Sequence, residues 1–264
     1  MTELRHLQLV ILGIMKDIDA LCVKNNIEYY LLGGSAIGAI RHKGFIPWDD
    51  DLDIVMDNKN YQRFIQVCRE QLNKEKYSLQ VGFEDWPLSF SKIRLKGTTL
   101  VEYDGYDAGE DKRGIFVDVF KMDNVAPGKL AACWQYACGK YYLCYQLLCR
   151  SYKSASLWKK ILMFLAYPLK IKAIRDFVKH QVEKYNDVET ECLGLFYGRT
   201  RYKNTIVKRS LFGTPKRVAF EDAEFFVPEH YHEYLTQMFG DYMKLPPVEQ
   251  RQGLHCISVD FGEY

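Results

Sequence analysis

Two aspartates spaced by one residue could hold a divalent cation. Asp51 and Asp53 belong to the segment Asp50-Asp51-Leu52-Asp53-Ile54-Val55. Residues two apart on a β-strand point to the same face, so both carboxylates would share one small space while Leu52 and Ile54 face a core. Like charges so placed repel each other unless a cation lies between them, and Mg²⁺ and Mn²⁺ prefer hard oxygen ligands. We therefore predict a magnesium (or manganese) site at Asp51 and Asp53.

A third aspartate could join this site. Asp118 stands in the middle of Gly114-Ile115-Phe116-Val117-Asp118-Val119-Phe120, a run that is otherwise rich in strand-forming residues. A charged residue with such neighbours is rarely buried unless it is paired or binds a metal ion. The alternative is that Asp118 faces solvent from an edge strand. We predict that Asp51, Asp53 and Asp118 are both the metal ligands and the catalytic residues.

A glycine-rich segment precedes the acidic one and could bind phosphate. Gly33, Gly34 and Ser35 lie between an expected strand over 27–32 and an expected short helix over 35–40. Paired glycines allow positive φ and close backbone approach, and Ser35 could cap a helix whose free N–H groups hold a phosphate. Taken alone, this pattern is more often an ordinary turn. Its position just before an Asp-x-Asp strand favours a nucleotide site.

Basic residues near these segments are further candidates for substrate binding. Lys92 and Arg94 alternate on one expected strand, where they could neutralise phosphate or form an ordinary solvated face. Arg41 precedes the acidic strand and could contact the nucleotide or balance Asp49 and Asp50. The residue types leave these alternatives open.

The elements that must position these residues form an α+β pattern. The first helix carries an apolar stripe from Leu4 to Leu21 and is therefore expected to face a core rather than to act as a targeting peptide. We expect a mixed-sheet catalytic core over 1–128. A mostly helical middle and C-terminal part over 129–264 should pack on that core and complete the substrate site. The elements expected in more detail are helices over 4–25, 61–72 and 129–185 and strands over 77–81, 88–95 and 114–120.

The composition fits a compact enzyme. The 264 residues are 48% hydrophobic and 27% charged, with a formal net charge of +2, so no overall positive field favours nucleic acid as a partner. The eight cysteines show no Cys-x-x-Cys spacing, which favours reduced thiols in a cytoplasmic protein. The longest apolar run, Ile161 to Tyr167, is much shorter than the roughly 20 residues that span a bilayer.

The helical middle also carries many rings and basic side chains. Aromatic residues from Trp134 to Tyr145 are followed by lysines that include Lys159, Lys160 and Lys170. Such a segment could lie on an anionic membrane, which would place the protein at the inner face of the plasma membrane. Packing of a helix pair with extended lysine side chains is the alternative that the pattern favours.

Together these segments resemble the LicD family, which includes the fukutin-type proteins. The similarity continues near the C-terminal end and covers most of the chain, with the middle least constrained. Members have the nucleotidyltransferase fold of polymerase-β-like enzymes, so the resemblance implies that fold here. The matching segments are Gly33-Gly34-Ser35, 41–53, 116–120, Phe220-Glu221, 239–243 and Leu245-Pro246-Pro247.

The resemblance implies transfer of a phosphorylated alcohol from a CDP-alcohol. In bacterial members the usual reaction moves phosphocholine from CDP-choline to a sugar hydroxyl of a teichoic acid, a lipopolysaccharide or another surface glycan, and CMP is released. The acceptor is expected to be lipid-linked. Fukutin-type relatives use CDP-ribitol instead. The family therefore indicates the reaction type better than the substrate.

The resemblance adds two residues to the predicted substrate site. His255 and Arg251 match family positions and could reach the donor. A choline headgroup offers no hydrogen-bond donor, so its recognition would require aromatic faces. Trp48 is one candidate, and the others are Trp86, Tyr103, Tyr106 and Tyr197.

Two other functions remain open at this stage. One is transfer of NMP from an NTP to a small molecule or to RNA, because the glycine and Asp-x-Asp segments are shared across the nucleotidyltransferase fold. The other is a binding protein that keeps the fold without turnover. Three clustered carboxylates argue against the second, because a protein without a metal has no reason to tolerate them.

Overall fold

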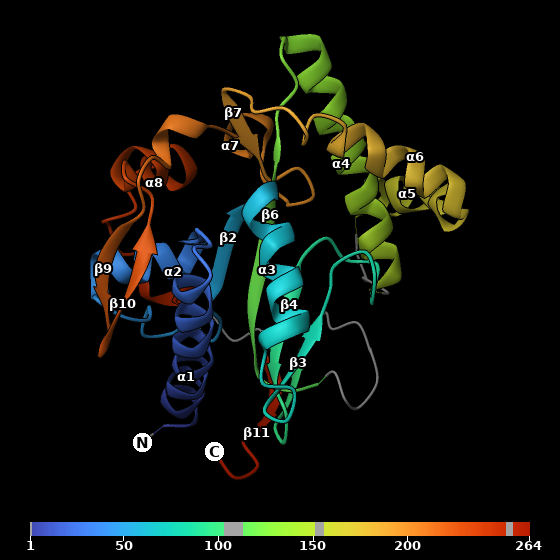
Figure 1. Ribbon diagram of the computed structural model, residues 1–264. Coiled ribbons are helices and arrows are strands. Elements are labelled where there is room, and N and C mark those ends of the chain that lie inside the picture. Colours follow the sequence, from blue (N-terminus) through green and yellow to red (C-terminus); the bar gives the residue numbers. More distant parts are fainter. Residues whose placement is uncertain (1, 103–112, 151–155, 252–255) are drawn as a thin grey trace.

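A mixed β-sheet forms the centre of the computed structural model, which describes residues 2–102, 113–150, 156–251 and 256–264 (Figure 1). Its path runs β1-β2-β6-β4-β3, and β7 and β8 extend it from β6. Strands β2 and β6 are parallel and the other pairs are antiparallel. The strands of this sheet are β1 Tyr30–Leu31, β2 Asp53–Asp57, β3 Tyr77–Gln80, β4 Ser91–Leu95, β6 Phe116–Asn124, β7 Cys192–Gly194 and β8 Ile206–Lys208.

Two helices from the N-terminal half pack against this sheet (Figure 1). Helix α1, Glu3–Lys24, is capped by the Thr2 hydroxyl and buries its apolar stripe. Helix α3, Asn58–Gln71, begins directly after β2, where the Asp57 carboxylate accepts the Asn60 N–H. Because this cap and β2 are adjacent in sequence, the last residue of the strand also fixes the start of the helix.

A helical layer lies beside the sheet (Figure 1). It has its own apolar core, in which Tyr142 of α4 lies with Leu169 and Val182. An ion pair joins the layer to the sheet, because Lys121 of β6 lies 2.6 Å from Glu183 of α6. The elements of this layer are α4 Lys129–Cys149, α5 Leu157–Leu165, the 3₁₀ turn Tyr167–Lys170 and α6 Lys172–Glu183.

The C-terminal part contains more strand than predicted. Beyond Glu183 the described chain adds β7 and β8 to the main sheet, forms the hairpin β9–β10 and sends β11 back to pair with β5. The prediction of a mostly helical C-terminal part is therefore wrong. Its strands have five residues or fewer, and β11 pairs with a strand more than 150 positions away. Local periodicity therefore does not predict these strands. The elements are α7 Tyr202–Thr205, β9 Lys216–Phe220, β10 Ala223–Val227, α8 Tyr231–Phe239, β11 Cys256–Asp260 and their partner β5 Thr99–Glu102.

The remaining predictions of the fold are close to the structure. The α+β class with a mixed sheet is confirmed, and the first helix lies within one residue of its predicted bounds. The strand expected over 27–32 shrinks to Tyr30–Leu31, and the acidic strand begins only at Asp53. In the described residues, every helix is too short or too polar to cross a bilayer.

Candidate active site

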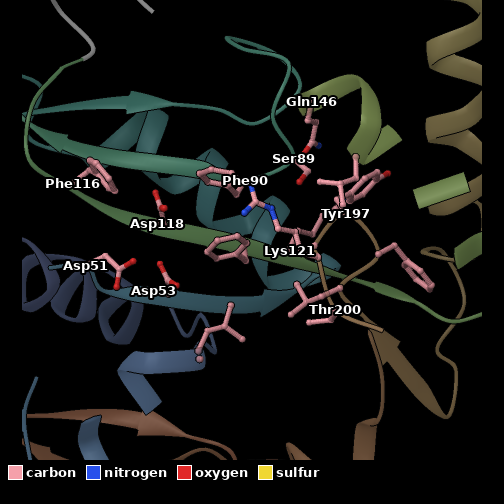
Figure 2. A pocket seen from close by; sticks show the side chains of 18 of the residues that line it. Asp51, Asp53, Ser89, Phe90, Phe116, Asp118, Lys121, Gln146, Tyr197 and Thr200 are labelled. Atoms are coloured by element: carbon pink, nitrogen blue, oxygen red, sulfur yellow. The ribbon is translucent and has the colours of Figure 1, made fainter. Parts of the chain in front are cut away.

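Neighbouring strands bring two of the predicted aspartates together. Asp53 of β2 and Asp118 of β6 are register partners in the parallel pair, so their side chains leave the sheet on the same face (Figure 2). Asp51 lies just before β2 and faces the same space (Figure 2). Leu52 and Ile54 are fully buried on the other side, as predicted. The structure therefore assembles the three carboxylates from segments more than 60 positions apart.

The carboxylates perturb one another strongly. Burial and the nearby charges of Asp51 and Asp118 raise the pKa of Asp53 well above its usual value. Burial also raises the pKa of Asp118 to about 6, although Lys92 opposes this rise. Asp49 responds in the same way, because burial and the charge of Asp51 raise its pKa to about 8. Burial, and after it the neighbouring carboxylates, thus disfavours the charged form of all three groups.

Lys92 is the cation nearest to this cluster. Its ammonium is buried, lies 2.9 Å from Asp118 and 3.3 Å from Glu102, and sits over the ring of Phe116. Arg94 is also buried, but it donates to the side chain of Gln80 and to the carbonyl of Gly114. The two predicted phosphate ligands therefore lie in an internal network, where Lys92 offsets part of the charge of Asp118.

The glycine turn contacts and positions the acidic segment. Helix α2, Gly33–Ile37, begins at Gly33, so the prediction that Ser35 caps it is wrong. Ser35 is instead buried inside the turn, and its hydroxyl accepts the N–H of Asp53 at 2.9 Å. A Cβ at Gly34 would lie 2.7 Å from a carboxylate oxygen of Asp49, so only glycine leaves room for that side chain. Both residues thus fix the start of β2 and the loop before it.

Residues from distant elements hold the acidic loop in place. Gln8 of α1 donates to the carbonyl oxygens of Ile46 and Asp49. Glu221, at the turn between β9 and β10, accepts two hydrogen bonds from Arg5 and one from the N–H of Phe45. Because these bonds come from both ends of the chain, the loop is fixed by tertiary contacts rather than by its own sequence.

A pocket of about 600 Å³ opens next to the carboxylates (Figure 2). This volume suits a ligand of nucleotide size. In Figure 2, Tyr197 and Thr200 lie on the opposite side of the pocket from Asp51 and Asp53. Residues from β2, β6, α4, α8 and the segment after β7 all line it, so the helical layer and the C-terminal part complete its walls.

The structure brings only part of the predicted site into this pocket. Of the described candidates, Gly33, Asp51, Asp53 and Asp118 line it, together with Tyr197. The others lie outside its lining, and His255, Tyr103 and Tyr106 fall outside the described residues. The described candidates that do not line the pocket are Gly34, Ser35, Arg41, Trp48, Trp86, Lys92, Arg94 and Arg251.

Arg41 and Trp48 lie in a neighbouring cluster. Arg41 donates to the carbonyl oxygen of Tyr242. The Trp48 ring lies edge-on to His42 and 5.4 Å from the guanidinium of Arg251. These contacts tie the segment before β2 to the C-terminal part.

Several residues that sequence reasoning missed line the pocket. Phe90 and Phe120 stack with ring centroids 5.0 Å apart, and Tyr234 adds another ring. The basic residues among them are Lys121, Arg150 and Arg199. The buried Nε of Arg150, at the end of α4, makes no hydrogen bond within the described part of the chain. Glu102 also lines the pocket and pairs with Lys92. Nothing local marks these residues, because they meet only when the strands and helices pack.

The carboxylates suit a divalent cation by their chemistry. They are hard oxygen donors, and burial together with the neighbouring carboxylates raises the pKa of Asp53 and Asp118, which a bound cation would oppose. As the side chains stand, no three His, Cys, Asp or Glu residues within the described ranges surround a single point. The donor chemistry suits Mg²⁺, but the described side chains are not arranged around one point, and Lys92 contacts one of the three carboxylates.

Comparison with known proteins shows a similarity to one family. A family model described as "LicD/FKTN/FKRP, nucleotidyltransferase domain" matches residues 26–130. The lipopolysaccharide cholinephosphotransferase LicD of Haemophilus influenzae (strain ATCC 51907 / DSM 11121 / KW20 / Rd) is 33% identical over an alignment of 264 positions, which covers 96% of this chain and 96% of that protein.

Two shorter similarities involve rickettsial proteins. An uncharacterized protein of Rickettsia typhi is 46% identical over 54 residues, which make up 20% of this chain and 18% of that protein. An uncharacterized protein of Rickettsia prowazekii is 56% identical over 41 residues, 16% of this chain and 15% of that protein. These matches are too short to say more about the whole chain.

Proposed function

The chain belongs to the LicD family, and from this premise we propose that it transfers phosphocholine from CDP-choline to a sugar hydroxyl of a surface glycan precursor. The acceptor would be a lipid-linked precursor of lipopolysaccharide, teichoic acid or a related glycan. We also propose that residues 1–128 form a nucleotidyltransferase-type core and that residues 129–264 complete its substrate site. The lining of the pocket by both parts supports this division.

One observation carries the proposal. Asp51, Asp53 and Asp118 stand together at one side of a pocket of about 600 Å³ that is otherwise rich in aromatic side chains. CDP-choline combines a diphosphate, which a cation held by carboxylates would bind, with a quaternary ammonium, which prefers ring faces. The two halves of the pocket thus have the two chemistries that this donor requires.

The reaction forms one phosphorus–oxygen bond and breaks another. The acceptor hydroxyl attacks the phosphorus that bears choline, the bond from this phosphorus to the CMP oxygen breaks, and CMP leaves. We assign the hydroxyl proton to a carboxylate oxygen of Asp118, which also orients the hydroxyl. Mg²⁺ held by Asp51, Asp53 and Asp118 would supply positive charge to the diphosphate.

Other pocket residues bind the two ends of the donor. Arg150 faces the pocket as a cation for the diphosphate oxygens. Phe90, Phe120 and Tyr197 offer ring faces to the choline headgroup. Gly33 and the turn that it begins lie beside the carboxylates, where the backbone can approach the donor closely.

A donor screen tests the proposal. The protein with Mg²⁺ is heated with CDP-choline, CDP-ethanolamine, CDP-ribitol, CDP-glycerol or NTPs, and the midpoint of unfolding is measured. We expect CDP-choline to raise the midpoint by several degrees and the other CDP-alcohols to raise it less, because they lack the quaternary ammonium. CMP and choline serve as controls for the separate halves of the donor.

Product analysis separates this function from NMP transfer. Release of CMP during turnover with a glycan acceptor would support phosphocholine transfer. Stabilisation by an NTP together with release of pyrophosphate would overturn it in favour of NMP transfer. Stabilisation by CDP-ribitol but not by CDP-choline would keep the reaction type and change the donor.

A further inference from the structure

The hairpin of α5 and α6 presents apolar side chains to solvent. Of the 23 large hydrophobic residues that are exposed in the described part of the chain, 10 lie between 157 and 177. No residue of α5 is buried. The six most exposed of the ten, each at least 55% exposed, define what we call the α5–α6 surface: Leu157, Trp158, Phe164, Leu165, Ile171 and Phe177.

This surface belongs to a well-anchored part of the fold. Ala166 and Leu169, on the inner side of the same hairpin, are completely buried against α4. Tyr141 of α4 donates a hydrogen bond to the carbonyl oxygen of Leu165, and Arg175 donates to that of Leu169. The hairpin therefore has a packed inner side, and its apolar outer side is a second, separate surface.

The charge of the hairpin identifies the partner that it fits. Residues 156–180 contain six Lys or Arg and one Asp, a formal charge of +5, so the rest of the chain carries a formal charge of −3. A second copy of the chain would bring the same positive charge to the same surface and be repelled. Exposed Trp, Phe and Tyr side chains among lysines are typical of helices that lie in the interface of an anionic bilayer.

We propose that the α5–α6 surface docks on an anionic lipid membrane. The apolar side chains enter the boundary between headgroups and acyl chains, and lysines such as Lys160 and Lys170 contact the anionic headgroups. Because α5 packs on α4, whose residues Gln146 and Arg150 line the pocket, docking holds the pocket near the membrane. The proposal does not rest on the proposed function, since binding needs neither donor nor acceptor.

Sedimentation with vesicles tests the proposal on the full chain without substrates. One set of vesicles contains phosphatidylcholine alone, and the other contains roughly one-third phosphatidylglycerol. We expect the protein to bind the anionic vesicles at least about tenfold more tightly, and the difference to shrink at high salt. Failure to bind the anionic vesicles, or equal binding to both sets, would overturn the proposal.

Double variants distinguish binding through this surface from nonspecific binding to lipid. Trp158→Ser with Phe164→Ser should weaken binding to anionic vesicles by at least about tenfold, and Lys160→Gln with Lys170→Gln should weaken it by about tenfold. The matched controls are Leu130→Ser with Val248→Ser and Lys24→Gln with Lys208→Gln, which change exposed residues elsewhere and should bind like the wild type.

The oligomeric state tests the competing partner, which is a second copy of the chain. We expect the wild type to sediment as a monomer in the absence of lipid, because the surface repels its own copy. A wild-type dimer that dissociates when Trp158 and Phe164 are replaced would overturn the proposal and assign the surface to a second copy. Wild-type binding by the Trp158 and Phe164 double variant would also overturn it.

Discussion

The carboxylate cluster and the α5–α6 surface depart from ordinary folding in opposite directions. At Asp53 and Asp118 the chain places carboxylates side by side in a partly desolvated site, and this burial raises the pKa of both groups. At Trp158 and Phe164 it leaves at least 70% of two large apolar side chains in water. Neither arrangement lowers the free energy of the isolated chain. Each becomes favourable only when a partner of matching chemistry arrives.

The two regions differ in how the chain holds them. The carboxylates lie in the sheet, and the loop before them is fixed by hydrogen bonds from α1 and from the β9–β10 turn. The apolar surface lies on a hairpin that contacts the rest of the chain through one side only. A small ligand requires several groups at fixed positions, whereas a lipid surface requires area and charge. The difference in how the two regions are held matches the difference in partner.

The largest effect should come from removing one buried charge. Asp53→Asn should reduce transfer by at least about a hundredfold, because the amide binds a cation poorly. Its midpoint of unfolding should stay the same or rise, because the amide carries no charge beside Asp51 and Asp118. CMP release and thermal unfolding measure the two effects. The exposed Asp187→Asn is the control and should change neither. An active Asp53→Asn protein would remove the carboxylate cluster from the mechanism.

Removing the neighbouring cation should act on stability instead. Lys92→Met leaves the half-buried Asp118 and Glu102 without this buried ammonium, which should cost about 3 kcal/mol of unfolding free energy. Denaturant unfolding measures the loss, and Lys59→Met, at an exposed position, should cost less than about 0.5 kcal/mol. If Lys92→Met unfolds like the wild type, the charge of Asp118 is balanced by another group, and the contrast between the two regions weakens.

A smaller effect should come from the contact that supports the acidic loop. The hydrogen bonds from Arg5 and Phe45 lower the pKa of Glu221, so its contribution to stability is complete above its ordinary pKa and is lost as the pH falls. Glu221→Gln should therefore cost roughly 1 kcal/mol near neutral pH, and its difference from the wild type should disappear below about pH 4. Denaturant unfolding at several pH values measures both. A cost that does not change with pH would show that the carboxylate charge is not what holds the loop.

The exposed Glu224, on the same hairpin, supplies the control for that experiment. Glu224→Gln keeps the backbone of the hairpin and removes a carboxylate that points to solvent. We expect a change of less than about 0.5 kcal/mol at every pH. A similar loss in both variants would point to the hairpin as a whole rather than to the contact of Glu221 with the loop.

Sequence reasoning succeeded where neighbouring residues carry the signal. The alternation of Asp51, Leu52, Asp53 and Ile54 predicted which side chains are buried, and the hydrophobic flanks of Asp118 predicted a strand. The pairing of β2 with β6 then places Asp53 beside Asp118. Their roles as ligands and catalysts stay predictions that the Asp53→Asn experiment addresses.

Sequence reasoning failed where a residue's role depends on distant contacts. Ser35 has the type and position of a helix cap, yet its hydroxyl accepts the N–H of Asp53 from the next strand. Phe90 and Phe120 meet only because β4 and β6 pair, and Arg150 reaches the pocket only because α4 packs beside the sheet. The basic and aromatic middle was expected to pack. The structure divides it into a packed inner side and the exposed α5–α6 surface.

A pair of leucines, one on each side, tests whether this division is real. Leu165 and Leu169 lie one turn apart in the same hairpin, with 55% and 0% of their surfaces exposed. Leu169→Ala should cost about 2–5 kcal/mol of unfolding free energy, because it leaves a cavity against α4. Leu165→Ala should cost less than about 0.5 kcal/mol, because its side chain stabilises little in the isolated chain. Denaturant unfolding of the two variants measures both losses. The same atoms are removed in each variant, so only the position of the leucine differs. Similar losses would mean that Leu165 packs within the fold, and the apolar surface would then not be free for a membrane.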